Sequence, residues 1–119
     1  MEKVLLVFAG GGLGSVGRYG LAELVKRMGI TSTFPWATLC ANVLACLIFA
    51  TVVYFFKGRI GPHSALLLTT GFCGGLSTFS TFSYETIELF NRQLYMTAMV
   101  YIGLSIILCF GCILLIYKA

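Results

Sequence analysis

The sequence TTGFCGGLSTFSTFSYE, residues 69–85, decides the fold of this chain. Adjacent glycines are followed by six hydroxyl residues in the nine positions 77–85, a composition that forms helices poorly. Yet the stretch belongs to the charge-free run from Ile60 to Tyr84, which is long enough to cross a bilayer. The pattern therefore predicts a membrane helix that is broken near mid-membrane. The alternative is a bent helix whose Ser and Thr side chains bond back to its own backbone.

A break at that depth is tolerated only where the backbone is buried in protein or lines a wet cavity. Its freed carbonyl groups can bind a cation, and its freed N–H groups can bind an anion. The stretch therefore indicates an ion site inside the membrane.

The rest of the chain is equally apolar. Of its 119 residues, 59% are hydrophobic and 10% are charged, and the mean hydropathy is +0.97. A soluble domain carries about 25% charged residues. This composition excludes a soluble enzyme, a disordered chain and a free nucleic-acid binder, and the net charge of +4 comes from scattered basic residues.

Four charge-poor segments predict four membrane helices, which makes the chain an all-α integral membrane protein with a single domain over residues 1–119. The predicted helices cover residues 3–26, 35–57, 63–90 and 93–117. The alternative for the N-terminus is a signal peptide, but only one basic residue precedes its apolar run.

The loop charges give little preference for one orientation. With four spans, one side of the membrane carries Lys3, Lys57, Arg59 and Lys118. The other carries Lys26, Arg27 and Arg92, plus Arg18 if its long side chain snorkels to the interface. This near-tie predicts insertion in both orientations and an antiparallel homodimer, unless uncounted features favour one orientation.

Polar residues inside the predicted spans are neutral, because Glu23, Glu85 and Glu88 fall near predicted helix ends. Phe79 and Phe82 share one helix face, and the positive edges of their rings can face a small anion. Hydroxyl residues surround them, namely Ser80, Thr81 and Ser83.

Two other helices add weakly polar groups. Asn42 supplies an amide donor, or alternatively a hydrogen bond that joins two helices. In the fourth helix, four residues fall within an arc of about 80° and form either a polar track or a packing seam: Tyr101, Ser105, Cys109 and Cys112. The five cysteines do not form the two CxxC pairs of a zinc site, so we expect small core residues.

These residues resemble the Fluc (CrcB) family of fluoride channels. The resemblance rests on GGLGSVGRY (residues 11–19), on Thr38-Leu39 with Asn42, and above all on GFCGGLSTFSTFSYE (residues 71–85). It implies a fluoride-selective channel that passively exports fluoride from the cytoplasm of a microorganism. It also implies a multi-pass protein of the cell membrane that assembles as a dual-topology homodimer and relieves fluoride toxicity.

The resemblance also implies site residues. A structural, non-transported sodium ion would be held by the backbone carbonyls of Gly74 and Ser77. The fluoride pore would include Phe79, Phe82, Asn42, Ser80, Thr81, Ser83, Tyr101 and Ser105. Cys109 stands where the family pattern suggests a hydroxyl residue.

Two other functions compete with this one. A small multidrug exporter needs a carboxylate within the membrane in its first helix, where this chain has only Glu23 near the end. A non-conducting partner subunit of a heteromeric channel is opposed only by the hydroxyl-rich break. No nucleophile, general-base pair or phosphate-binding loop appears, so we expect no catalysis.

The near-tie of basic residues predicts that a single cysteine introduced into one loop, on a background without the native five, is labelled from both sides of the membrane. About half of the molecules should react from each side, because neither orientation is favoured. Labelling from one side only would refute dual topology.

Overall fold

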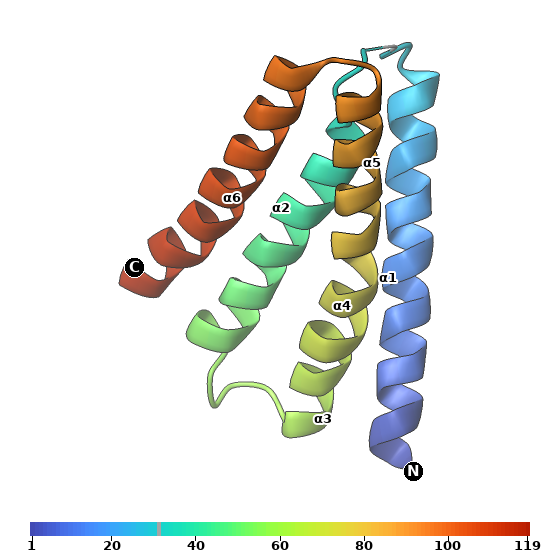
Figure 1. Ribbon diagram of the computed structural model, residues 1–119. Coiled ribbons are helices and arrows are strands. Elements are labelled where there is room, and N and C mark those ends of the chain that lie inside the picture. The colour runs from blue at the N-terminus through green and yellow to red at the C-terminus, as the bar shows by residue number, and fades with distance from the viewer. Residues whose placement is uncertain (31) are drawn as a thin grey trace.

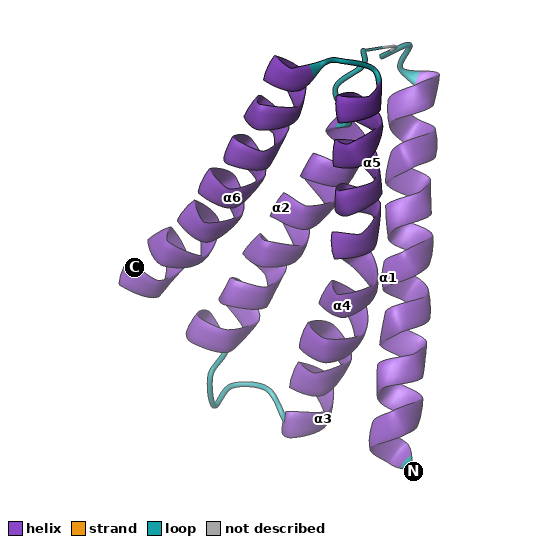
Figure 2. Cartoon of the chain, in the orientation of Figure 1, coloured by secondary structure: helices purple, strands orange, loops and turns teal. Residues whose placement is uncertain are grey.

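The computed structural model describes residues 1–30 and 32–119, and the described residues form helices joined by short loops, without strands (Figures 1 and 2). Four helical spans are long and apolar enough to cross a membrane. Their bounds are Glu2–Arg27, Trp36–Phe55, Pro62–Asn91 and Tyr95–Lys118, each within two residues of the predicted bounds. The prediction of an all-helical protein with four membrane-length helices is confirmed.

The first and last spans are single helices, α1 (Glu2–Arg27) and α6 (Tyr95–Lys118). The second consists of α2 (Trp36–Ala50) and one π-helical turn, η1 (Thr51–Phe55). The third has four segments, which are α3 (Pro62–Leu66), the π-helix η2 (Leu67–Cys73), α4 (Gly74–Leu76) and α5 (Phe79–Asn91).

The N-terminus and the loop between η1 and α3 lie at the lower end of the bundle, and α6 runs from the upper end down toward that side (Figure 1). That side therefore carries the first group of basic residues, Lys3, Lys57, Arg59 and Lys118, as the sequence predicts. The α1–α2 and α5–α6 connections lie at the opposite end, with the second group.

The third span is broken at Ser77 and Thr78. Both residues are extended, with φ/ψ of −80°/154° at Ser77 and −153°/120° at Thr78. The predicted break is therefore present, although it follows the adjacent glycines, and Gly74 itself has helical angles of −63°/−36°. Back-bonding also occurs, because the Ser77 hydroxyl donates to the Cys73 carbonyl at 2.8 Å, but it accompanies the break and does not replace it.

Glycines bring α1 into backbone contact with the third span. Gly10 and Gly14 lie one turn apart on α1, and Gly71 and Gly75 lie one turn apart on the facing span. A Cβ atom at Gly14 would collide with the Phe72 carbonyl oxygen, and one at Gly75 would collide with the Gly11 carbonyl oxygen. Small residues at this spacing let membrane helices approach closely. The role of Gly75 is thus close packing against α1, and the break itself follows at Ser77 and Thr78.

The other side of the third span packs against α2 and α6, which run side by side (Figure 1). Leu39 of α2, Leu89 of α5, and Ala98 and Tyr101 of α6 form one buried cluster. A second cluster joins α2 to η2 and α4, and its buried members are Ala41, Ala45, Cys73 and Leu76. The break lies between these clusters in sequence, so both of its helical arms are anchored.

We predict that Gly14→Ala and Gly75→Ala each destabilise the protein by about 1–3 kcal/mol, because each methyl group meets backbone that cannot move aside. Gly12→Ala is the matched control, because a Cβ there meets nothing within 4 Å. It should be neutral or slightly stabilising. Thermal unfolding in detergent measures all three, and equal melting temperatures would contradict the packing role.

Candidate functional site

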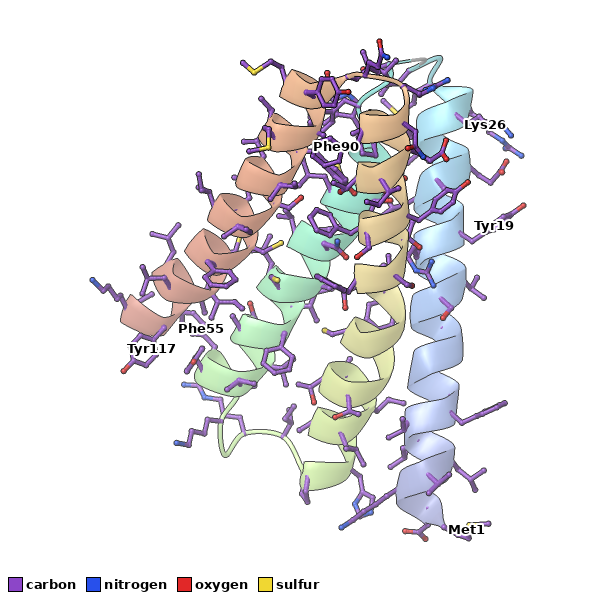
Figure 3. The ribbon with its side chains drawn as sticks, viewed as in Figure 1. Met1, Tyr19, Lys26, Phe55, Phe90 and Tyr117 are labelled. Atoms are coloured by element: carbon purple, nitrogen blue, oxygen red, sulfur yellow. The ribbon has the colours of Figure 1, made fainter. Side chains whose placement is uncertain are left out.

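A groove opens beside the break, between α2, α5 and α6. Its volume is about 300 Å³. We call it the break groove and define it by its ten lining residues, Asn42, Cys46, Ser77, Thr78, Phe79, Phe82, Ser105, Ile106, Cys109 and Phe110. Figure 3 shows aromatic rings and sulfur atoms in the space between these helices.

The amide of Asn42 holds the break in place. Its Oδ1 accepts from the Thr78 N–H at 2.8 Å, and its Nδ2 donates to the Thr78 carbonyl at 3.4 Å. One side chain thereby bonds both backbone polar groups of Thr78, the residue at which the helix is interrupted. The interhelical hydrogen bond left open by the sequence is present, and the second Nδ2 hydrogen remains for a ligand in the groove.

Thr78 also caps α5. Its Oγ1 accepts from the Thr81 N–H at 3.1 Å, which is the contact of a helix N-cap. Thr81 and Ser80 both lie against this hydroxyl, at 3.1 and 3.2 Å. These two predicted pore residues therefore surround the cap and are not among the groove-lining residues.

The break deprives the carbonyl groups of residues 74–77 of their helical donors. In an α-helix, the Gly74 carbonyl would accept from the Thr78 N–H and the Ser77 carbonyl from the Thr81 N–H. Here the Thr78 N–H donates to Asn42 and the Thr81 N–H donates to the Thr78 hydroxyl. The two carbonyl groups that the family resemblance assigns to a cation are therefore among those that the break leaves without a helical donor.

The Gly75 carbonyl is satisfied differently. Arg18 Nε of α1 donates to it at 3.2 Å, and the Arg18 side chain is half-buried. Arg18 therefore turns toward the break, which corrects the expectation that it snorkels to the interface. Its contact is with protein backbone, in keeping with a structural role.

Aromatic rings form one wall of the groove. Phe82 lies 5.0 Å from Tyr101 and 5.8 Å from Phe79, between ring centroids, with tilted planes. Tyr101 is fully buried, whereas Phe79 is 79% exposed and projects away from the chain. The structure thus brings the three predicted aromatic residues together in a row that runs from the core to the surface.

Ser105 supplies an unpaired hydroxyl. Its side chain is 7% exposed and lines the groove. Among the residues that the structure describes, its Oγ is the buried side-chain polar atom without a hydrogen-bond partner. Buried polar groups are nearly always satisfied, so this one calls for a water molecule or a ligand.

The predicted fourth-helix stripe faces inward. Tyr101 and Ser105 are buried, and Cys109 and Cys112 are half-buried on the same side of α6. Ser83 is half-buried, but it lies outside the groove lining. Of the eight predicted pore residues, the groove therefore collects Phe79, Phe82, Asn42 and Ser105.

Sequence reasoning missed three contributors. The first is Thr78, which belongs to the hydroxyl-rich stretch and whose N-cap position before α5 a Thr at the start of a helix could have signalled. Glu85 was placed near a helix end, yet its Oε1 accepts from the Tyr101 hydroxyl at 2.9 Å. Cys46 lies one turn after Asn42 and lines the same groove, which the spacing of the two residues could have indicated.

Comparison with known proteins identifies the family. The sequence model described as CrcB-like protein, Camphor Resistance (CrcB), matches residues 5–117. This chain belongs to the CrcB-like family.

Curated relatives of this CrcB-family protein are named fluoride-specific ion channel FluC. The relative from Phocaeicola vulgatus is 44% identical over 110 residues, which cover 91% of this chain and 89% of the relative. The relative from Flavobacterium psychrophilum is 38% identical and covers 91% and 88%. The relative from Pyrococcus furiosus is 40% identical and covers 90% and 86%. The family is one of ion channels and not of enzymes, and the four apolar helices make this chain a multi-pass membrane protein.

We predict that Asn42→Ala destabilises the protein by about 1–3 kcal/mol, because it leaves the Thr78 N–H unsatisfied inside the membrane. Asn42→Asp should cost at least as much, because an ionised carboxylate cannot donate to the Thr78 carbonyl and is costly inside the membrane. Thr51→Val is the control, because it removes a hydroxyl that bonds within its own helix, to the Leu47 carbonyl at 2.7 Å. Thermal unfolding in detergent measures the stability of the three variants. An Asn42→Ala protein as stable as Thr51→Val would contradict the stabilising role of the Asn42–Thr78 hydrogen bonds.

Proposed function

We propose that this chain forms a fluoride-selective channel that exports fluoride passively across the cell membrane of a microorganism and so relieves fluoride toxicity. The carrying observation is the break groove, which is lined by the unpaired Ser105 hydroxyl, the Asn42 amide and the rings of Phe79 and Phe82. Its family membership, with relatives named fluoride-specific ion channels, supports the same ligand.

The groove suits a small anion that must also leave. Fluoride is strongly hydrated, so a pore must replace its water with other donors. Ser105 offers an O–H, Asn42 an N–H, and Phe82 the positive edge of its ring. None of these carries a full charge, so the contacts replace water without making a deep trap, as conduction requires.

We further propose that the working unit is an antiparallel, dual-topology homodimer. Gly74 is exposed on the single chain, directly before the break, and open backbone carbonyls cannot face lipid without a large cost. Phe79 projects from the same region. A second copy placed over this face would cover the break, and the near-equal basic charges at the two ends allow the antiparallel arrangement.

The diverted carbonyl groups of Gly74 and Ser77 support a structural sodium ion in that dimer. Carbonyl oxygens suit hard cations, and two residues from each copy would give four oxygens. No carboxylate belongs to this set, which favours a monovalent ion. The ion would supply positive potential near the anion route.

The two alternatives fare differently. A multidrug exporter needs a carboxylate within the first helix, but Glu23 lies four residues before the end of α1 at Arg27. A non-conducting partner subunit has the same fold as a channel, so only the activity of the purified protein alone separates the two.

We predict selective fluoride efflux from liposomes that contain only this purified protein. Phe79→Ile and Phe82→Ile should each reduce the flux at least tenfold, because isoleucine keeps bulk but has no ring edge. Phe8→Ile is the control, because Phe8 is 80% exposed on α1 and is not among the groove-lining residues. A fluoride electrode measures all four proteins. Absence of flux in the parent would contradict the channel, and parental flux in both pore variants would contradict the ring-edge account.

We predict that flux declines over hours when sodium is replaced by N-methylglucamine on both sides, since the buried ion exchanges slowly. Ser77→Thr should behave as the parent does, because the ligand is a backbone carbonyl. Restoring sodium should restore flux. Undiminished fluoride flux in N-methylglucamine would contradict the proposed sodium site.

A further inference from the structure

Two thiols face each other across the break groove. Cys46 of α2 and Cys109 of α6 both line it, from the two facing helices. Cys46 lies one helical turn after Asn42, and Cys109 lies one turn after Ser105. The thiol pair therefore forms the next layer of the groove after the amide and the hydroxyl.

The chemistry of this layer differs from the rest of the groove. Thiols are poor hydrogen-bond donors, so the pair adds little to the binding of a small hard anion. Thiolates are strong ligands for soft metal cations. Within residues 1–30 and 32–119, no group of three His, Cys, Asp or Glu side chains is arranged to hold a metal ion. A four-coordinate zinc site is therefore excluded there, whereas a two-coordinate site needs only the observed pair.

The net charge of the metal–thiolate complex determines which soft metal cation the two thiols can bind inside the membrane. A charged complex inside the membrane is costly. Two thiols and one Hg²⁺ ion give RS–Hg–SR and release two protons, so the bound complex is neutral. Soft d¹⁰ cations such as Hg²⁺ also prefer two ligands in a line, which matches two sulfur atoms on facing helices.

We propose that Cys46 and Cys109 form a two-thiolate site for one soft d¹⁰ metal cation inside the break groove. Both cysteines are half-buried, and the groove is open enough for an ion to enter. Occupation fills the space beside Ser105 and ties α2 to α6. This consequence rests on the proposed fluoride function, whereas the metal binding itself does not.

The binding test uses the full-length protein with Cys40, Cys73 and Cys112 replaced by alanine, and HgCl₂ as the probe. We expect one mercury ion per chain, retained in a tenfold excess of a monothiol, with both remaining cysteines protected together from maleimide. Ultraviolet absorption of the mercury–thiolate bonds and intact-protein mass measure the complex. In the five-cysteine protein, peptide mass spectrometry should show Cys46 and Cys109 as the protected pair, so the test also holds if the variant folds poorly.

The matched control keeps two thiols but separates them. It carries Cys40 and Cys109, with Cys46→Ser, because Cys40 is exposed on α2. We expect the control to lose the metal to the same monothiol at least tenfold more readily. Equal retention by the two variants, or maleimide reaction of Cys46 and Cys109 that HgCl₂ does not slow, would overturn the site.

Fluoride flux tests the consequence separately, with each variant compared with its own metal-free rate. HgCl₂ should reduce flux at least tenfold when Cys46 and Cys109 are both present, and a dithiol chelator should restore it. If HgCl₂ protects both thiols of a conducting protein but leaves its fluoride flux unchanged, the proposed inhibition of flux by the bound metal is wrong. Protection in a protein that shows no fluoride flux at all would support the metal site and contradict the proposed function.

Discussion

The pairing of Asn42 with the Thr78 peptide is the interaction on which the rest of the structure depends. A membrane helix satisfies its backbone internally, and a break removes that satisfaction where water is absent. Asn42 bonds the backbone N–H and C=O of Thr78, Thr78 caps the next helix, and Arg18 donates to the Gly75 carbonyl. The break survives because α1, α2 and the hydroxyl of Thr78 itself supply partners that a continuous helix would otherwise provide.

These hydrogen bonds also determine which backbone carbonyl groups are left without a donor. The Thr78 N–H is taken by Asn42 and the Thr81 N–H by the Thr78 hydroxyl, so the Gly74 and Ser77 carbonyls lose the donors that a continuous helix would give them. The same two N–H groups that bond to Asn42 and to the Thr78 hydroxyl are therefore the ones that these carbonyl groups lack. An open carbonyl in a membrane has to meet protein, water or a cation, which is why the exposed face of the break bears on both assembly and ion binding.

Close helix packing makes this geometry rigid. Gly10 and Gly14 of α1 meet Gly71 and Gly75 of the third span through backbone atoms, so α1 is held along the segment that leads into the break. On the other side, Leu76 and Cys73 pack into the cluster with Ala41 and Ala45. The groove is therefore lined by side chains whose backbones are fixed from two directions, as a binding site requires.

Much of this protein follows from sequence alone. The charge-free runs locate all four spans within two residues, because bilayer thickness sets helix length and charge is excluded from the core. The glycine and hydroxyl composition of residues 69–85 indicates a broken helix, and the motif identifies the family. The inward stripe from Tyr101 to Cys112 follows from helical periodicity.

Tertiary structure decided which groups meet. Helical periodicity shows on which face of its own helix each residue lies. It does not show which residue of another helix lies opposite. The pairs Asn42–Thr78, Arg18–Gly75 and Glu85–Tyr101 depend on the register between helices, and so does the meeting of Cys46 and Cys109 in one groove. That register is set by glycine contacts and by side-chain packing summed over whole helices. For the same reason the composition indicated a break near the glycines, whereas packing against α1 keeps Gly75 in α4 and moves the break to Ser77 and Thr78.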